Sequence, residues 1–355
     1  MEPTKTGRRT GRRWLSIGAA VVVAALAVVA PASMSSAEAA KPHGLPGMKI
    51  LLTNDDSMQA AKASHSDGLG LYEVRKALCA KGADVVVMAP WAVQSGKGSA
   101  VTNSGSFRLG QKAVPAGYEN DCASAPAKGA VYGVCTGTDP CGPTSGSATP
   151  ADTVMFATRG GLKATVGWAE PDLVVSGSNS GANASSSVND SGTAGAAIAA
   201  NADGIPAVAI SSATAADFSM PVVNYQATAK WAADFITNLN KKGLLLQDKF
   251  VLNVNYPDIS TGAKAKSAKW TSVGSATVAF HNYALQPDGS YTIQLALCTG
   301  LPICKETRKT ADWTWLSKGH ITVTPINWDR TYGVAEGGKT YKKVKSFVEK
   351  YTKTS

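Results

Sequence analysis

The stretch Met48–Asp56, MKILLTNDD, decides the fold of this 355-residue chain. An apolar run of strand length ends there in four polar residues, which is typical of a buried strand that reaches a ligand site at its carboxyl end. Leu69–Ala80 follows with apolar residues at helical spacing, and Asp84–Ala89 (DVVVMA) is a second buried-strand run, closed by Pro90. A strand–helix–strand unit implies a parallel sheet with helices on its faces, so the sequence predicts an α/β fold.

The alternation of strands and helices resumes after an interruption at residues 103–150. This interruption is rich in Gly, Ser, Pro and Cys, and we expect an excursion or hairpin held by disulfides. The elements predicted beyond it are a helix at Asp152–Gly161, a strand at Leu173–Val175, a helix at Thr193–Asn201, a strand at Ala207–Ser211, a helix at Asn224–Asn240 and a strand at Phe250–Asn255. Their order continues the same parallel sheet.

The C-terminal part has a different pattern. Residues 265–330 hold Thr-, Val- and Trp-rich segments without a convincing helix, so we expect an antiparallel β appendage there. Lys339–Lys353 predicts a basic helix with apolar residues at i, i+3, i+4 and i+7, and we interpret its lysines as a solvated face. The expected domains are a signal peptide at 1–39, an α/β core at 40–260, and a β extension with the terminal helix at 261–355.

The N-terminus carries part of the positive charge. Residues 1–39 hold five basic and two acidic residues, a net +3, which leaves +7 of the total +10 for the rest of the chain. A basic start, the apolar run Trp14–Ala32 and the small-residue exit Ala37-Glu38-Ala39 are the three parts of a secretory signal. Arg12-Arg13 also fits a twin-arginine signal, and an uncleaved anchor is the alternative. We expect a secreted protein with no membrane segment after cleavage.

Six cysteines follow the expected cleavage site, and an even number in an exported protein indicates disulfides. Cys298 and Cys304 enclose a short loop with Gly300 and Pro302, so we expect these two to pair. The other four allow three pairings that the sequence leaves open: Cys79, Cys122, Cys135 and Cys141. A zinc site is the weaker interpretation, because no C-x-x-C occurs and the four histidines are scattered.

Three polar clusters each follow a buried-strand run, so the topology brings all three to one edge of the sheet. The first is Thr53-Asn54-Asp55-Asp56-Ser57, whose two adjacent carboxylates repel each other unless a hard divalent cation lies between them. The second is Gln94–Ser99 (QSGKGS), whose glycines allow successive backbone N–H groups to cradle an anion. An Asx turn and a flexible turn are the respective structural alternatives.

The third cluster is Ser176–Asn183 (SGSNSGAN), followed by Ser191-Gly192-Thr193 at the start of an alanine-rich helix. Amide oxygens suit a metal, and hydroxyls at a helix N-terminus favour anions, although an ordinary serine cap is the alternative. A cation site beside anion cradles is the equipment of metal-assisted phosphate-ester hydrolysis. A serine hydrolase is not indicated, since G-x-S-x-G is absent from the sequence.

These segments resemble the SurE family of survival-protein nucleotidases. The matching stretches, in the family's order, are MKILLTNDD at 48–56, APWAVQSGKGSAVT at 89–102, TPADTV at 149–154, PDLVVSGSNSGAN at 171–183, SGTAGAA at 191–197, LNVNYP at 252–257 and, more weakly, GHITVTPINWD at 319–329. The resemblance implies a Rossmann-like core with a β extension that often exchanges between subunits. It therefore also implies a homodimer or homotetramer.

The resemblance implies roles for individual residues. The metal ligands would be Asp55, Asp56, Ser95 and Asn179, with Asn54 and Asn183 beside them, and the phosphate would be held by Gly96, Ser191, Gly192 and Thr193. The implied cofactor is Mg²⁺ or Mn²⁺. The implied activity is hydrolysis of nucleoside 5′- or 3′-monophosphates, with breadth toward other phosphomonoesters and short polyphosphate. Ser57 departs from the family's usual Gly, and Met58–Asp67 is longer than usual.

Several alternatives stay open at this point. The attacking group is either a water activated by the metal or one of the two aspartates. His65 is a candidate general acid, although a surface histidine is the commoner interpretation. A phosphate- or nucleotide-binding protein without turnover is the competing function. The +7 charge also suggests nucleic-acid or cell-surface binding, but no nucleic-acid motif is present, and we expect no specific nucleic-acid partner.

Overall fold

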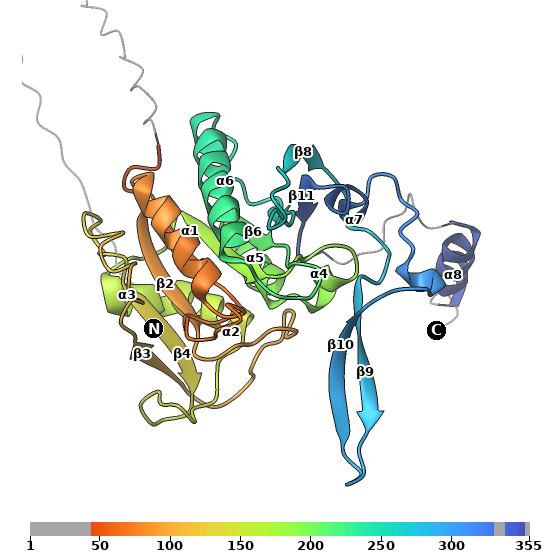
Figure 1. The fold of residues 1–355 in the computed structure, drawn as a ribbon, viewed down its shortest axis with the longest axis horizontal. Helices are drawn as coiled ribbons and strands as arrows, with labels where there is room; N and C mark the ends of the chain where they lie inside the picture. Colours follow the sequence, from red (N-terminus) through yellow and green to blue (C-terminus); the bar gives the residue numbers. More distant parts are fainter. Residues whose placement is uncertain (1–43, 330–337, 352–355) are drawn as a thin grey trace, which may run out of the picture. The chain divides into compact units, whose positions relative to one another are not determined.

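The computed structural model describes residues 44–329 and 338–351, so the predicted signal segment at 1–39 lies outside it. Within the described chain, nine strands form one sheet in the order β3-β4-β2-β1-β5-β6-β7-β11-β8 (Figure 1). The strands are β1 Lys49–Thr53, β2 Asp84–Pro90, β3 Phe107–Gln111, β4 Val131–Thr136, β5 Leu173–Ser180, β6 Ala207–Ser212, β7 Val251–Tyr256, β8 Lys266–Trp270 and β11 His320–Ile326.

The order of the strands reverses at β1. The chain moves outward from β1 through β2 to β4, and then returns to the other side of β1 for β5, β6 and β7; all these neighbouring pairs are parallel. Only β3 on β4 and β11 on β7 are antiparallel in this sheet. The gap between β1 and β5 is therefore a topological switch point, where ligands bind in open α/β sheets.

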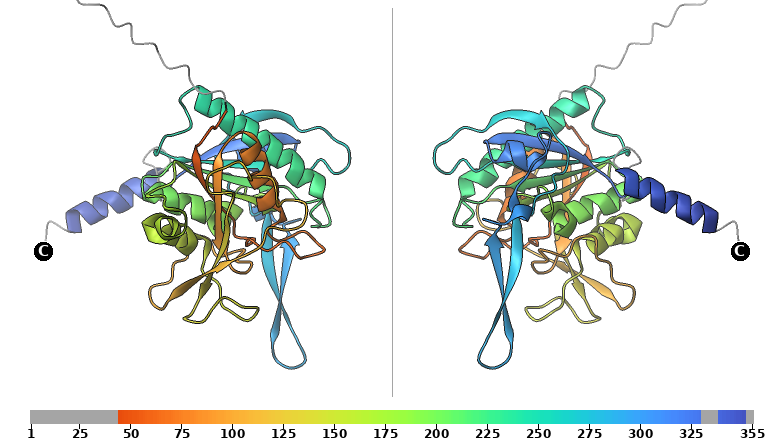
Figure 2. Two further views of the ribbon diagram at one scale, coloured as in Figure 1. Left: turned by 90° about the vertical axis from the view of Figure 1, so that its left-hand side faces the viewer. Right: turned by 90° about the vertical axis from the view of Figure 1, so that its right-hand side faces the viewer.

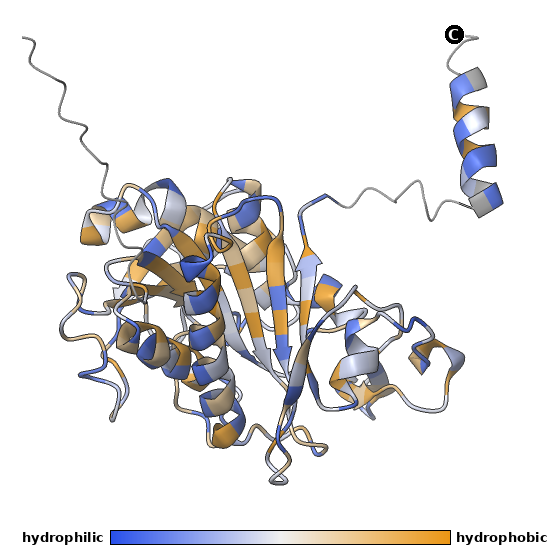
Figure 3. Ribbon diagram, turned by 90° about the horizontal axis from the view of Figure 1, so that it is seen from above, coloured by the Kyte–Doolittle hydropathy of each residue, from blue (hydrophilic) through white to orange (hydrophobic). Residues whose placement is uncertain are grey.

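Helices cover both faces of the sheet (Figure 2). Ile50 and Leu52 of β1 belong to the core under α1 (Leu69–Ala80) and α6 (Val222–Lys241), whereas Leu51 belongs to the core under α2 (Pro150–Phe156) and α5 (Gly192–Ala202). Side chains of a strand alternate between the two faces, so a continuous apolar run is buried on both. Figure 3 shows apolar residues along the strands. The predicted α/β fold with a three-layer core is confirmed.

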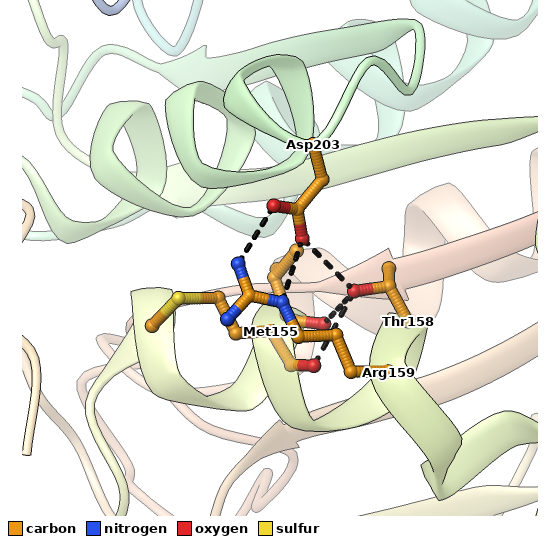
Figure 4. A network of polar contacts seen from close by, with 5 residues as sticks. Met155, Thr158, Arg159 and Asp203 are labelled. Atoms are coloured by element: carbon orange, nitrogen blue, oxygen red, sulfur yellow. Dashed lines mark hydrogen bonds and ion pairs between the residues drawn. The ribbon is translucent and has the colours of Figure 1, made fainter.

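The end of α5 remote from the sheet edge is fixed by a small polar network (Figure 4). Arg159 lies in the π-helical turn η1 (Ala157–Gly161), which joins α2 to α3 (Leu162–Val166). Its Nη2 donates to Asp203 Oδ1 over 2.7 Å and its Nε to Asp203 Oδ2 over 3.2 Å. Asp203 is the C-cap of α5, so this contact helps to set the direction of the helix whose N-terminus reaches the switch point.

The C-terminal part differs from the expectation in two ways. Residues 265–330 are not simply an antiparallel appendage, because β11 joins β7 in the main sheet and β8 adds to β11 in parallel. The segment also contains a short helix, α7 (Asp312–Leu316). The part of this segment that forms a separate antiparallel sheet is the hairpin of β9 (Ala279–Leu285) and β10 (Tyr291–Leu297). The predicted basic helix is present as α8 (Gly338–Tyr351), mostly hydrophilic with apolar bands in Figure 3. Domain boundaries at 40 and 260 remain predictions.

Three disulfides staple the described chain. Cys298–Cys304 forms as predicted, and the pairings that the sequence left open are Cys79–Cys122 and Cys135–Cys141. The excursion at 103–150 is indeed a hairpin, β3 on β4, and Cys79–Cys122 ties it to α1. No helix within residues 44–329 and 338–351 is both long enough and apolar enough to cross a membrane.

We expect Cys79–Cys122 to contribute the largest stabilisation of the three disulfides. It joins residues 43 positions apart, whereas the other two pairs are separated by 6. Loop-closure entropy then predicts that Cys79→Ser with Cys122→Ser lowers the free energy of unfolding by about 4 kcal/mol. Chemical denaturation of this double variant, beside Cys298→Ser with Cys304→Ser, measures the difference. Equal midpoints for the two double variants would contradict the prediction.

Candidate active site

The two carboxylates at the end of β1 are the centre of the candidate site. Asp55 is 3% exposed and Asp56 is 2% exposed. The hydroxyl of Thr193 donates to Asp55 Oδ1 over 2.5 Å, while Asp56 accepts the backbone N–H of Ser180 at 2.6 Å and the hydroxyl of Ser95 at 3.2 Å. The loop after β2, the end of β5 and the start of α5 therefore converge on the residues that follow β1. All three predicted clusters meet at one edge of the sheet.

The loop Gln94–Ser99 is held in place through its backbone. The N–H of Gln94 donates to the carbonyl of Asp55 over 2.7 Å, and that of Gly98 donates to the carbonyl of Asp190 over 3.0 Å. Gly195 in α5 packs against the backbone of Gly98 so closely that a Cβ there would clash with the Gly98 carbonyl. Gly96 at the exposed tip adopts a φ of +77°, which favours glycine, and it has open space around it.

The N-terminus of α5 is turned toward Asp55. Gly192 lies against this residue, since a Cβ at Gly192 would stand 2.7 Å from Asp55 Cβ. Ser191 is the N-cap, and its hydroxyl accepts the N–H of Ala194 at 2.9 Å. Ser191 thus has the ordinary capping contact, and the Thr193 hydroxyl orients a carboxylate. Their expected contact with a phosphate remains a prediction.

The three asparagines of the predicted site lie in different surroundings. Asn54 Nδ2 donates to the carbonyl of Ser178 over 3.3 Å, while its Oδ1 is buried without a partner. Asn179 precedes Ser180, which contacts Asp56, and its Nδ2 donates to the carbonyl of Gly181 over 2.7 Å. Asn183 instead bonds to β6 and β7, through Ser211 and Asn255. Within the described residues, Asn183 therefore bonds to the neighbouring strands and not to Asp55 or Asp56.

Burial dominates the electrostatics of the acid pair. It raises the pKa of Asp55, and hydrogen bonds from Thr193 and the backbone of Gly192 oppose the shift only in part. Burial, with the charge of Asp55 added, raises the pKa of Asp56 to about 8 against hydrogen bonds from Ser180, Ser95 and Asn54. Two adjacent carboxylates in a low dielectric do not both ionise readily unless a positive charge joins them.

The donor set fits a hard divalent cation. Within residues 44–329 and 338–351, Asp55 and Asp56 form no ion pair with Lys, Arg or His. Their polar surroundings consist of hydroxyl, amide and backbone groups, and Asn54 contributes a buried oxygen without a partner. The described chain holds no cluster of three or more His, Cys, Asp or Glu. Oxygen ligands with two carboxylates suit Mg²⁺ or Mn²⁺ better than zinc.

The pKa shifts predict a pH dependence of cation binding. Asp56 has an ordinary pKa of 3.8 and a folded value of about 8, so the metal-free protein loses stability as the pH rises between these values. Cation binding needs the ionised pair and therefore displaces about one proton near pH 6. We expect Mn²⁺ to raise the Tm more at pH 8 than at pH 5. Calorimetry in buffers of different ionisation enthalpy counts the protons, and a pH-independent Mn²⁺ affinity would contradict this expectation.

The sequence missed several residues that shape the site. The Ser180 backbone N–H is one, because main-chain donors leave no mark in a sequence. Tyr225 of α6 is another: burial raises its pKa, Asp56 adds to this shift, and its hydroxyl donates to the carbonyl of His65 over 2.9 Å. His65 is thus connected to this region through its backbone. Gly195 was part of a matching stretch, but its contact with Gly98 was not foreseen.

The fold and site together define a Rossmann-like α/β protein with a buried carboxylate pair at its switch point. Residues 50–279 match the family model described as "Survival protein SurE". The chain belongs to the SurE family.

Curated relatives and a solved structure are similar to this chain. The 5'-nucleotidase SurE of Christiangramia forsetii is 32% identical over 283 residues, which cover 79% of this chain and 92% of the relative. The 5'-nucleotidase SurE of Solidesulfovibrio magneticus is 32% identical over 282 residues, covering 79% and 92%. The crystal structure of the SurE protein from Aquifex aeolicus superposes with a TM-score of 0.55 at 23% identity, covering 83% of this chain and 99% of that one. This last likeness supports the fold alone.

Proposed function

We propose that this protein is an exported phosphomonoesterase that hydrolyses nucleoside monophosphates with Mg²⁺ or Mn²⁺. The observation that carries the proposal is the buried pair Asp55 and Asp56, which lies at the switch point and, among the residues that the structure describes, has uncharged partners. Membership of a family whose similar relatives are named 5'-nucleotidases supports the hydrolysis of phosphomonoesters. The base, the sugar and the metal are the finer parts of the proposal.

The cation would be held by Asp55, Asp56, Ser95 and Asn179. A bound divalent ion supplies positive charge to the phosphoryl oxygens and lowers the pKa of water. Thr193 keeps the Asp55 carboxylate in one orientation, while Ser95 and the Ser180 N–H do the same for Asp56. Gly96 presents its backbone at an exposed loop tip, where a phosphate can approach the N–H groups. Lys97, exposed beside it, adds a positive charge that attracts anionic substrates.

A substrate panel tests the activity. Phosphate release by the protein lacking residues 1–39 is measured from nucleoside 5′- and 3′-monophosphates, p-nitrophenyl phosphate and short polyphosphate, with Mn²⁺, Mg²⁺ or EDTA. We expect release that depends on the metal, with nucleoside monophosphates preferred. A flat ranking across the panel would indicate a broad-range phosphatase. No release from any substrate would overturn the proposal and favour a phosphate- or nucleotide-binding protein.

Export is part of the proposal and has its own test. Three disulfides in the described chain suit an oxidising compartment, and the basic, apolar and small-residue segments at 1–39 suit a signal. Mass spectrometry of the protein recovered from culture medium is expected to find Ala40 at the N-terminus. Recovery of the full-length chain from the membrane fraction would instead indicate an uncleaved anchor.

We also propose that the protein is a homodimer or homotetramer assembled through the hairpin β9–β10. The hairpin register places six large apolar side chains on one face, and each is at least 41% exposed: Tyr283, Leu285, Tyr291, Ile293, Leu295 and Leu297. A contiguous apolar face of this kind marks an interaction surface, and a second copy of the chain provides a matching one.

Introducing positive charge on the apolar face of the hairpin tests the assembly. Ile293→Lys with Leu295→Lys is expected to shift the protein to a monomer in light scattering after gel filtration. The matched control is Thr292→Lys with Gln294→Lys, which places the same charges on the opposite face of β10. A monomeric wild type, or a control that dissociates equally, would contradict this proposal.

A further inference from the structure

A second pair of carboxylates lies outside the candidate active site and contacts the segment that leads from Asn183 through the short helix α4 (Ser187–Asp190) to α5. The backbone N–H of Ser185 donates to Asp312 Oδ1 over 3.0 Å and to Oδ2 over 3.2 Å. The Ser185 hydroxyl lies 3.3 Å from both Asp312 Oδ1 and Glu306 Oε2. Ser185 has a φ of +51°, so the loop turns sharply where the two carboxylates hold it.

Asp312 accepts hydrogen bonds from several segments at once. It is fully buried at 0% exposed, and it also accepts the N–H groups of Gly274 at 3.1 Å and Trp313 at 2.7 Å. Within the described residues its side chain forms no ion pair with a basic group. A carboxylate that accepts several backbone N–H bonds fixes the position of every segment that donates to it.

Glu306 extends the contact to the neighbouring residue of the loop. It accepts the N–H groups of Ser275 at 2.6 Å and Ala276 at 3.0 Å, and the carbonyl of Ala276 in turn accepts the N–H of Ser186 at 3.2 Å. Residues 185 and 186 are thus bonded to a segment about 90 to 130 positions further along the chain, at the base of the hairpin β9–β10.

Ser185 and Ser186 lie in the sequence between two residues that we expect at the substrate, Asn183 and Ser191. Asn183 lies two residues before Ser185, and Ser191, the N-cap of α5, lies six residues after Ser185. The sheet holds Asn183 through Ser211 and Asn255, so Asp312 supplies the fixed point on the other side of the turn. Asp55 and Asp56 have separate supports in Thr193, Ser95 and Ser180.

We propose that Asp312, assisted by Glu306, is a positioning residue that fixes the segment 183–191, which includes α4, for substrate binding. The proposal rests on the proposed function and deepens it, because it assigns control of substrate affinity to a residue of the C-terminal segment. A general loss of stability would weaken the binding of substrate and cation alike, whereas the proposed role affects only one of them. Substrate affinity depends on Asp312, whereas cation affinity does not.

Steady-state kinetics with p-nitrophenyl phosphate and Mn²⁺ test this distinction. Asp312→Ala is expected to raise KM by about tenfold while kcat changes by less than about threefold. The Mn²⁺ Kd from calorimetry is expected to stay within about threefold of wild type, since Asp55 and Asp56 keep their own partners. Asp312→Asn retains one carbonyl oxygen for the Ser185 N–H and should restore part of the substrate affinity.

Two further variants make the result independent of folding defects. A Cβ at Gly274 would clash with the Ser185 hydroxyl and with Glu306. Gly274→Ala should therefore push Ser185 away from the two carboxylates and raise KM without removing a carboxylate. The matched control is Asp84→Ala, because Asp84, at the start of β2, is also a buried carboxylate and accepts the backbone N–H of Ala127 at 3.0 Å. We expect the control to lower the Tm without changing KM.

The outcomes separate this inference from the proposed function. An unchanged KM in Asp312→Ala and Gly274→Ala would overturn the inference while leaving the activity established. An equal rise of KM in Asp84→Ala would also overturn it, since any buried carboxylate would then have the same effect. A wild type without activity on the whole substrate panel would overturn the proposed function and this inference with it.

Discussion

Asp56→Asn is expected to abolish metal-dependent phosphate release, with a loss in kcat/KM of about a thousandfold or more. The amide has nearly the shape of the carboxylate, so its oxygen can still accept the N–H of Ser180, while its NH2 group lies against the Ser95 hydroxyl and can donate to it. It lacks the negative charge that binds the cation. The substitution also removes the repulsion with Asp55, which lowers the cost of burial. We therefore expect lower activity together with equal or higher stability of the metal-free protein.

The measurement combines kinetics, Mn²⁺ calorimetry and thermal unfolding. The matched control is Asp172→Asn, because Asp172 accepts the N–H of Lys49 at 2.8 Å, at the opposite end of β1 and β5. This control should retain wild-type activity and Mn²⁺ affinity. An active Asp56→Asn protein, or one that binds Mn²⁺ as wild type does, would remove Asp56 from the cation site.

Gly195→Ala is expected to have the second largest effect, although Gly195 is not a predicted ligand. The new Cβ would clash with the carbonyl of Gly98, and a backbone atom cannot rotate away as a side chain can. Either α5 or the loop Gln94–Ser99 must move, and both carry groups that hold the acid pair. We expect kcat/KM to fall by about a hundredfold, and the free energy of unfolding to fall by about 1–3 kcal/mol because of overpacking.

Gly142→Ala is the control for this substitution. Its Cβ would meet only the carbonyl of Pro140 at 4.0 Å, so the same added methyl has room. Kinetics and chemical denaturation of the two variants measure the difference. If Gly195→Ala retained full activity, the close approach of α5 to the loop would not be needed for the site.

The central fold was predictable because its signals are local. Leu69–Ala80 has the bounds of the observed α1, and each buried-strand run of the core became a parallel strand. The convergence of Asp56, Ser95 and the end of β5 at Ser180 followed from topology, since carboxyl ends of parallel strands meet at one edge. These inferences need only the period of apolar residues and the geometry of a parallel sheet.

The parts that were missed depend on distant contacts. β8 is short and mostly exposed, and its sequence KSAKW has no buried run, so its pairing with β11 was not visible. α7 has only five residues, too few for a helical period. The orientation of Asn183 toward Ser211 and Asn255, and the contact of Asp312 with Ser185, join residues whose proximity exists only in the folded chain.

The convergence of remote segments on the acid pair also has a consequence for how the chain folds. Asp55 contacts Thr193 across 138 residues, and Asp56 contacts Ser180 across 124. Contacts of such high sequence separation form slowly, because the entropy of closing long loops must be overcome first. A cation that binds only the assembled site adds its binding free energy to the native state alone. Mn²⁺ should therefore slow unfolding far more than it speeds refolding, with the acid pair completed only after the transition state.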